Sequence, residues 1–203
     1  MINRAFFFSY VRSHLFGGTL SKKQVEGLTY ILDAWEEKYS KKDHRWLAYA
    51  LGTTHHETDR KTQPIREYGN KSYFEKRYDI EGSNPGLARR LGNIFPGDGV
   101  LFHGRGFVQL TGRANYKKMA QFLGIDMTSS AAAADCALEL ENATKIMFKG
   151  MEDGIFTGKK FANYFNKERE DWGNARRIIN GTDKANLIAA HAQQYYAAIS
   201  SVA

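Results

Sequence analysis

Apolar side chains recur every three or four residues along much of the chain, which predicts a mainly helical protein. A first helix is expected over residues 3–15, ahead of Gly17 and Gly18. Ser21, with Gln24 three positions later, forms a capping box that opens a second helix. The apolar positions of that helix have the spacing of a core-facing stripe: Val25, Leu28, Leu32, Trp35 and Tyr39.

A third helix is predicted to begin after its cap, Asp43, and to end at Glu57. Its inward positions repeat at helical spacing: Leu47, Ala50, Leu51, Thr54 and Thr58. Residues 59–64 lack this repeat and end in Pro64, which disfavours helix at the residue before it. We therefore expect the chain to leave the helix after Glu57 and to carry Glu67 on a separate element.

The rest of the chain predicts further helices, with a polar loop over residues 126–135. The expected starts are Asn84-Pro85, Thr111, Asp171 and Asp183. The expected ends are Gly92, Gly124, Gly154 and Gly181. No internal repeat or low-complexity tail interrupts this pattern, and 203 residues fit a single domain.

Composition narrows the class of partner without choosing one. The formal net charge of +7 favours an anionic partner: nucleic acid, an anionic membrane surface or a bacterial envelope. The single cysteine, Cys136, excludes an internal disulfide. The run at residues 5–11 is too short for a signal peptide and is followed at once by Arg12, with no small-residue cleavage site. No stretch approaches the roughly 20 apolar residues that span a bilayer.

Glu57 and Glu67 lie ten positions apart on either side of the turn-prone segment. Two carboxyl groups on separate elements can hydrolyse a glycosidic bond, one giving a proton to the leaving oxygen and one deprotonating water. The alternative is that both glutamates simply lie on solvated faces. A zinc site at His55-His56-Glu57 is excluded by spacing, because the position four residues after His56 is Arg60.

A glycine-rich run follows near the middle of the chain. Gly104 and Gly106 resemble the start of a dinucleotide fingerprint, but Gln109 stands at the third glycine position and no convincing strand precedes the run. Nucleotide binding is therefore rejected. Thr111 is predicted to cap the following helix, and its hydroxyl could also hold a water.

Four signatures then stand in order along the chain: His56-Glu57-Thr58, Arg66-Glu67 before Gly69, Gly104-Arg105-Gly106 through Gln109, Thr111 and Asn115, and Ile178-Ile179-Asn180-Gly181. Together they resemble glycoside hydrolase family 19, the chitinase-like group that includes phage-type endolysins. By that resemblance Glu57 matches the general acid, Glu67 the general base and Thr111 a residue that helps hold the attacking water. The remaining matches are assigned to substrate binding: His56, Gln109, Asn115 and Asn180.

The resemblance implies a mostly helical, two-lobed, lysozyme-like body with a substrate cleft, formed by residues 1–203 as one catalytic domain without a separate wall-binding module. It implies no metal or organic cofactor. It also implies inversion, with the carboxyl groups roughly 6.5–9.5 Å apart. Plant-type members space the two glutamates more widely and carry extra loops and disulfides, which are absent here, so a shorter groove is expected.

These observations favour a peptidoglycan glycosidase that cuts β-1,4 bonds between amino sugars. A chitinase and a non-enzymatic basic binding module are the alternatives. The expected partner is bacterial cell-wall peptidoglycan, with no nucleic acid and no stable membrane insertion. We expect a monomer made in the host cytoplasm without a signal peptide, acting on the wall after release.

Overall fold

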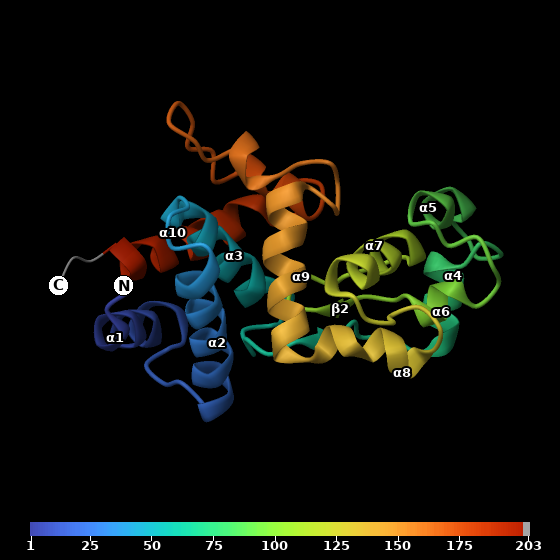
Figure 1. Cartoon of the computed structure of the whole chain (residues 1–203), viewed down its shortest axis with the longest axis horizontal. Helices are drawn as coiled ribbons and strands as arrows, with labels where there is room; N and C mark the ends of the chain where they lie inside the picture. The colour runs from blue at the N-terminus through green and yellow to red at the C-terminus, as the bar shows by residue number, and fades with distance from the viewer. Residues whose placement is uncertain (201–203) are drawn as a thin grey trace. The chain divides into compact units, whose positions relative to one another are not determined.

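The computed structural model describes residues 1–200, and in this range the chain is mainly helical (Figure 1). The predicted helical class is confirmed, and it agrees with a lysozyme-like helical fold. The chain forms two compact units: unit 1 comprises Met1–Gln63 and the chain from Met147 onward, and unit 2 comprises Pro64–Ile146. The prediction of a single domain stays a prediction. No helix within residues 1–200 has both the length and the apolar character needed to cross a bilayer.

Unit 1 is built from helices at both ends of the sequence. Its elements are α1 (Arg4–Leu15), α2 (Lys22–Lys38), α3 (His44–Glu57), the 3-10 helices η2 (Phe161–Asn163) and η3 (Asn174–Ile178), and α10 (Ala185–Ser200). The helix α9 (Leu140–Asp153) begins in unit 2 and continues into unit 1.

Helix α3 is the centre of unit 1, and every residue from Leu47 to His55 is buried. Helix α10 packs along it (Figure 1). Gly52 permits this close approach, because a Cβ atom at that position would lie 2.8 Å from the Cα atom of Ala192. The stability of α3, and so the placement of its last residue, Glu57, therefore depends on burial on several sides.

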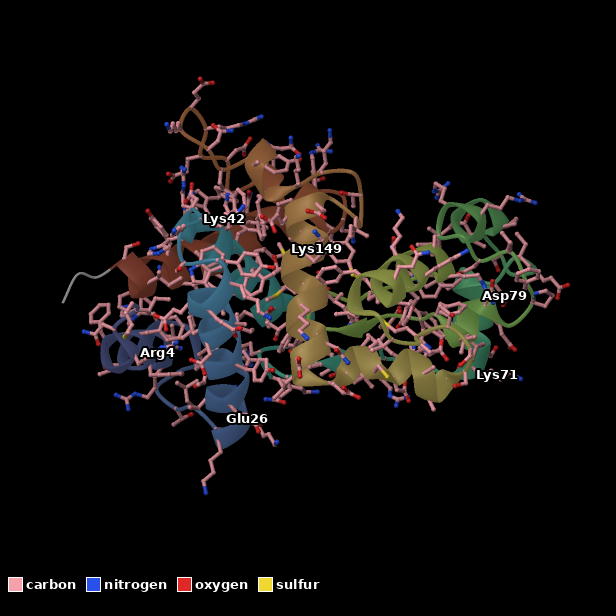
Figure 2. The ribbon with its side chains drawn as sticks, viewed as in Figure 1. Arg4, Glu26, Lys42, Lys71, Asp79 and Lys149 are labelled. Carbon is pink, nitrogen blue, oxygen red and sulfur yellow. The ribbon has the colours of Figure 1, made fainter. Side chains whose placement is uncertain are left out.

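The predicted N-terminal caps of α2 and α3 are confirmed, whereas α10 begins at Ala185, two residues after the predicted cap Asp183. Ser21 and Gln24 form the reciprocal capping box of α2, and the Asp43 carboxylate accepts from the Arg45 N–H at the start of α3. Arg4 of α1, labelled in Figure 2, pairs with Asp33 and Glu36 of α2. The Ser21 and Asp43 side chains each accept from a backbone N–H that the first helical turn leaves unpaired.

The segment that follows Glu57 is held against α2. The Gln24 side chain donates to the Arg60 carbonyl at 2.9 Å, and the Thr62 hydroxyl donates to the Gln24 carbonyl at 3.1 Å. The close approach of this segment to α2 requires glycine at position 27, since a Cβ atom there would lie 1.7 Å from the Thr62 carbonyl oxygen. Arg60 and Thr62 have positive φ angles, so the packing holds a backbone that these residues rarely adopt.

A pair of histidines is enclosed between α3 and α10. The rings of His55 and His191 have centroids 4.4 Å apart, and His55 Nδ1 lies 3.2 Å from the hydroxyl of Tyr195. Burial lowers the pKa of His55 to about 3, and electrostatic repulsion from His191, Arg60 and His56 acts in the same direction. The folded protein therefore keeps His55 neutral.

This environment predicts a loss of stability in acid. The folded pKa lies below the unfolded value near 6.5, so the stabilisation is complete above that pH and is lost as pH falls toward 3. At pH 4.5 the contribution of His55 to unfolding free energy should fall by on the order of 2–3 kcal/mol. Urea unfolding at pH 7.5 and 4.5 should show a smaller acid loss in His55→Gln than in wild type, with His14→Gln as the exposed control. Equal losses in all three proteins would contradict the assignment.

Unit 2 holds the short strands and the remaining helices. Its elements are β1 (Ile65–Arg66), α4 (Lys71–Tyr78), α5 (Pro85–Arg90), α6 (Asp98–Leu101), β2 (Arg105–Gly106), α7 (Arg113–Leu123), α8 (Ala131–Ala134) and the 3-10 helix η1 (Asp135–Leu138). Strands β1 and β2 pair antiparallel, with Ile65 opposite Gly106. The loop predicted over residues 126–135 is wrong in its second half, because α8 and η1 together cover residues 131–135.

Arg105 organises the middle of unit 2, although its side chain is only 1% exposed. Its guanidinium pairs with Asp135 of η1 at 2.8 Å and donates to the carbonyls of Leu101 and His103 and to the hydroxyl of Tyr116. A buried charge is tolerated when it is paired and hydrogen-bonded in this way. The arginine of the glycine-arginine-glycine run is therefore a structural centre of the unit.

Two buried carboxylates fix the turn before α6. Asp79, labelled in Figure 2 just after α4, accepts from the N–H groups of Gly97 and Gly99 at 2.7 and 3.1 Å. Asp98 accepts from the Ile94 and Phe95 N–H groups and pairs with Arg113. Together these contacts anchor the turn that leads into the glycine-rich run.

Candidate active site

The two candidate carboxylates belong to different units. Glu57 is the last residue of α3 in unit 1, and Glu67 follows β1 in unit 2. The prediction that the chain leaves the helix after Glu57 is therefore confirmed, whereas Glu67 lies directly after the two-residue strand β1 and not on an element of its own. Each carboxylate has its own set of partners within its unit.

Glu57 is held by a buried arginine. Arg176 of η3 is 4% exposed, and its Nη1 donates to Glu57 Oε1 at 2.5 Å. The Nε of Arg176 donates to the Asp183 carbonyl at 3.1 Å, which fixes the orientation of the guanidinium. The Glu57 side chain is 16% exposed. Glu57 is thus neither a solvated surface residue nor an unpaired buried charge.

Glu67 is held by neutral donors. The Tyr78 hydroxyl of α4 donates to Oε1 at 2.8 Å, and the Gly104 N–H donates to Oε2 at 3.1 Å. The Glu67 N–H also donates to the Gly104 carbonyl at 2.8 Å, continuing the pairing of β1 with β2. Burial raises the pKa of Tyr78, and the charge of Glu67 raises it further, so the hydroxyl stays protonated and keeps donating.

Gly104 is required at its position by this arrangement. A Cβ atom there would lie 2.6 Å from Gln109 Oε1 and 3.1 Å from Glu67 Oε2. Gln109 itself has a positive φ of 54°, and its amide donates to the carbonyls of Ile65 and Gly106. The glycine lets the backbone approach both side chains, which supports the interpretation of these glycines as sites of close approach rather than nucleotide binding.

Thr111 does not cap α7, and that prediction was wrong. The helix begins at Arg113 after Gly112, whose φ is 89°, and the Arg113 N–H is satisfied by the Asn93 side chain at 2.8 Å. The Thr111 hydroxyl instead donates to the Gln109 carbonyl at 2.8 Å. Its role in holding water stays a prediction.

The other substrate-binding candidates follow their own units. In unit 2, the Asn115 amide donates to the Thr111 carbonyl at 3.0 Å, so Gln109, Thr111 and Asn115 form one chain of contacts. Of these three residues, Gln109 approaches Gly104, as Glu67 does. In unit 1, half-buried His56 precedes Glu57, and the Asn180 N–H donates to the Arg176 carbonyl at 3.0 Å. No three His, Cys, Asp or Glu side chains within residues 1–200 come together as a metal site.

Sequence reasoning missed two partners of the carboxylates, Arg176 and Tyr78. Tyr78 lies in a segment, residues 71–78, that mixes aromatic and cationic side chains, and no local pattern in it singles out the contact with Glu67. Arg176 precedes the Ile178-Ile179-Asn180-Gly181 signature beside a second arginine, Arg177, which is exposed. No local pattern distinguishes the buried arginine from the exposed one, because Arg176 is 119 positions from Glu57.

No family model matches the chain. Over 87 residues the chain is 32% identical to a glycosyl hydrolase family 19 domain-containing protein from Haemophilus influenzae. The match covers 40% of this chain and 44% of that protein, so the chain spans less than half the length of this curated relative. Partial similarity to a family 19 protein is therefore what the comparison establishes, and it agrees with the family that the four signatures resemble.

Proposed function

We propose that the chain is an inverting O-glycoside hydrolase that cuts β-1,4 bonds between the amino sugars of bacterial peptidoglycan. The observation that carries the proposal is that hydrogen-bond donors orient each of the two carboxylates. Arg176 donates to Glu57, and Tyr78 and the Gly104 N–H donate to Glu67. Glutamates on a solvated helix face are hydrogen-bonded by water and do not require protein donors of this kind. The partial similarity to a family 19 protein supports the same class of chemistry.

In the proposed reaction, Glu57 gives its proton to the glycosidic oxygen as the bond to the anomeric carbon breaks. Arg176 engages Oε1 of Glu57, so Oε2 is the oxygen assigned to carry that proton. Glu67 takes a proton from a water, whose oxygen forms the new bond at the anomeric carbon. The reaction requires both carboxyl groups at one glycosidic bond, with room for the water on the side of Glu67.

Tyr78 and the Gly104 N–H prepare Glu67 for this role. Both donate to its carboxylate without bringing a positive charge into direct contact with it. Each carboxylate oxygen has more than one acceptor site, so Glu67 can also accept from a water. Thr111 is proposed to hold that water, and Gln109, Asn115, Asn180 and His56 are proposed to bind sugar.

Charge favours peptidoglycan over chitin as the substrate. The chain carries a formal net charge of +7, and peptidoglycan contains peptide carboxylates whereas chitin is an uncharged polymer of N-acetylglucosamine. The chitinase alternative is favoured by the partial similarity to a family 19 protein. Both substrates have the same linkage, so the two assignments share one site and one mechanism.

Digestion of purified peptidoglycan beside colloidal chitin tests the assignment. We expect mass spectrometry to find disaccharide-peptide fragments with a new reducing sugar end, and much slower release of oligomers from chitin. Faster release from chitin would support the alternative. A basic binding module would retain binding to the wall and release no fragments from either polymer.

A further inference from the structure

Two buried hydroxyl groups lie on the turns of α3 that precede Glu57. Tyr49, Thr53 and Glu57 are spaced four residues apart, so their side chains share one face of the helix. Tyr49 and Thr53 are both 0% exposed. Neither the Tyr49 hydroxyl nor the Thr53 hydroxyl has a hydrogen-bond partner among the residues that the structure describes.

Thr53 also lacks the hydrogen bond that a threonine in a helix commonly makes to its own helix. Threonines in helices often donate to the carbonyl one turn earlier, as Thr144 does to Leu140 and Thr58 does to Thr54, each at 2.7 Å. Thr53 makes no such bond. A buried hydroxyl without a partner costs free energy that phenylalanine or valine would avoid at these two positions.

Tyr49 lies within electrostatic reach of the Glu57–Arg176 pair. Its ring packs against Phe165 and Trp172, in the segment that leads into η3. Burial raises the pKa of Tyr49, while Arg176 acts to lower it and Glu57 to raise it. Both members of the ion pair therefore act on this hydroxyl, which stays protonated.

We propose that Tyr49 and Thr53 hold an internal water against the Glu57–Arg176 pair and are positioning residues for the general acid. Buried waters typically make about three hydrogen bonds to polar groups that lack other partners. Two buried, unpartnered hydroxyls on the helix face that ends at Glu57 provide such groups, since a hydroxyl can both donate and accept. This water fixes the carboxyl orientation that proton donation requires, so the inference rests on the proposed glycosidase function.

Tyr49→Phe and Thr53→Val test the inference, each with a matched control. Tyr195→Phe removes a fully buried hydroxyl that contacts His55, and Thr54→Val removes the neighbouring buried hydroxyl that donates to Met147 Sδ. With a soluble N-acetylglucosamine oligomer, Tyr49→Phe and Thr53→Val should lower kcat about tenfold with little change in KM, the equivalent of one hydrogen bond. Both should shift the acid-dependent limb of the kcat–pH profile, whereas the controls should not.

A second measurement does not depend on activity. A crystal structure of the wild-type protein should show an ordered water within hydrogen-bonding distance of both hydroxyls. Thr53→Ser keeps the hydroxyl and should retain activity, which covers the case in which Thr53→Val does not fold.

Wild-type kcat and pH profiles in Tyr49→Phe and Thr53→Val, or a dry site in the crystal, would overturn the inference. If those results came with an inactive Glu57→Gln variant, the proposed function would stand without this water. An active Glu57→Gln variant would instead overturn the proposed function itself.

Discussion

Replacing Glu57 by glutamine should lower the rate of glycoside hydrolysis by at least about 10²-fold, the usual contribution of general acid catalysis. The amide has the shape of the carboxyl group but cannot donate an acidic proton to the leaving oxygen. Its oxygen can still accept from Arg176, so the geometry at the end of α3 should persist. The rate is measured with purified peptidoglycan or a soluble oligomer at saturating substrate.

The same variant should also be less stable than wild type. Arg176 is 4% exposed, and the substitution leaves its charge without an anionic partner. The retained hydrogen bonds to the amide and to the Asp183 carbonyl limit the loss, which should be about 1–3 kcal/mol in urea unfolding. Glu26→Gln, on the exposed surface of α2, is the control and should retain full activity. More than about a tenth of the wild-type rate in a folded Glu57→Gln protein would argue against Glu57 as the acid.

Local signals in the sequence predicted much of the helical fold. The capping box of Ser21 and Gln24, the Asp43 cap and the Asn84-Pro85 start all formed as expected, because each depends only on residues within one helical turn. Gly124 likewise ends α7 in the left-handed conformation. The apolar repeat after Asp43, and its loss over residues 59–64, correctly placed Glu57 at the end of α3.

Contacts between distant segments account for what the sequence could not predict. Thr111 precedes a helical repeat, as a capping residue does, but Asn93, on an earlier segment, satisfies the Arg113 N–H instead. Strands β1 and β2 have two residues each, too few for a period-two pattern, yet their pairing joins Glu67 to Gly104. The four signatures selected Glu57 and Glu67 as candidates, while the partners of the two carboxylates depend on the tertiary structure.

Removing the side chain of Glu67 should abolish hydrolysis in a way that a small anion can reverse. Glu67→Gly removes the proposed base and should lower the rate by at least about 10²-fold, because water is a poor nucleophile without proton transfer. It also leaves space beside two donors, the Tyr78 hydroxyl and the Gly104 N–H, that held the carboxylate. Azide needs no deprotonation and is an anion, so it suits that space. Added azide should restore turnover of a soluble N-acetylglucosamine oligomer, whereas Glu67→Gln, whose amide still fills the space, should not respond.

The product of that rescued reaction reports the stereochemistry of the mechanism. Glu57, the proposed acid, should still protonate the leaving oxygen, and azide should attack the anomeric carbon from the side opposite the departing sugar. A β-linked substrate should therefore give an α-glycosyl azide, just as the wild-type enzyme should give the α-anomer of the new reducing end at the earliest times. Proton NMR during early turnover distinguishes the anomers before they equilibrate. A β-anomer appearing first in the wild-type reaction would mean retention through a covalent intermediate. Glu67 would then attack the sugar itself or take no direct part in the reaction. Either outcome would contradict the assignment of Glu67 as a base that acts through water.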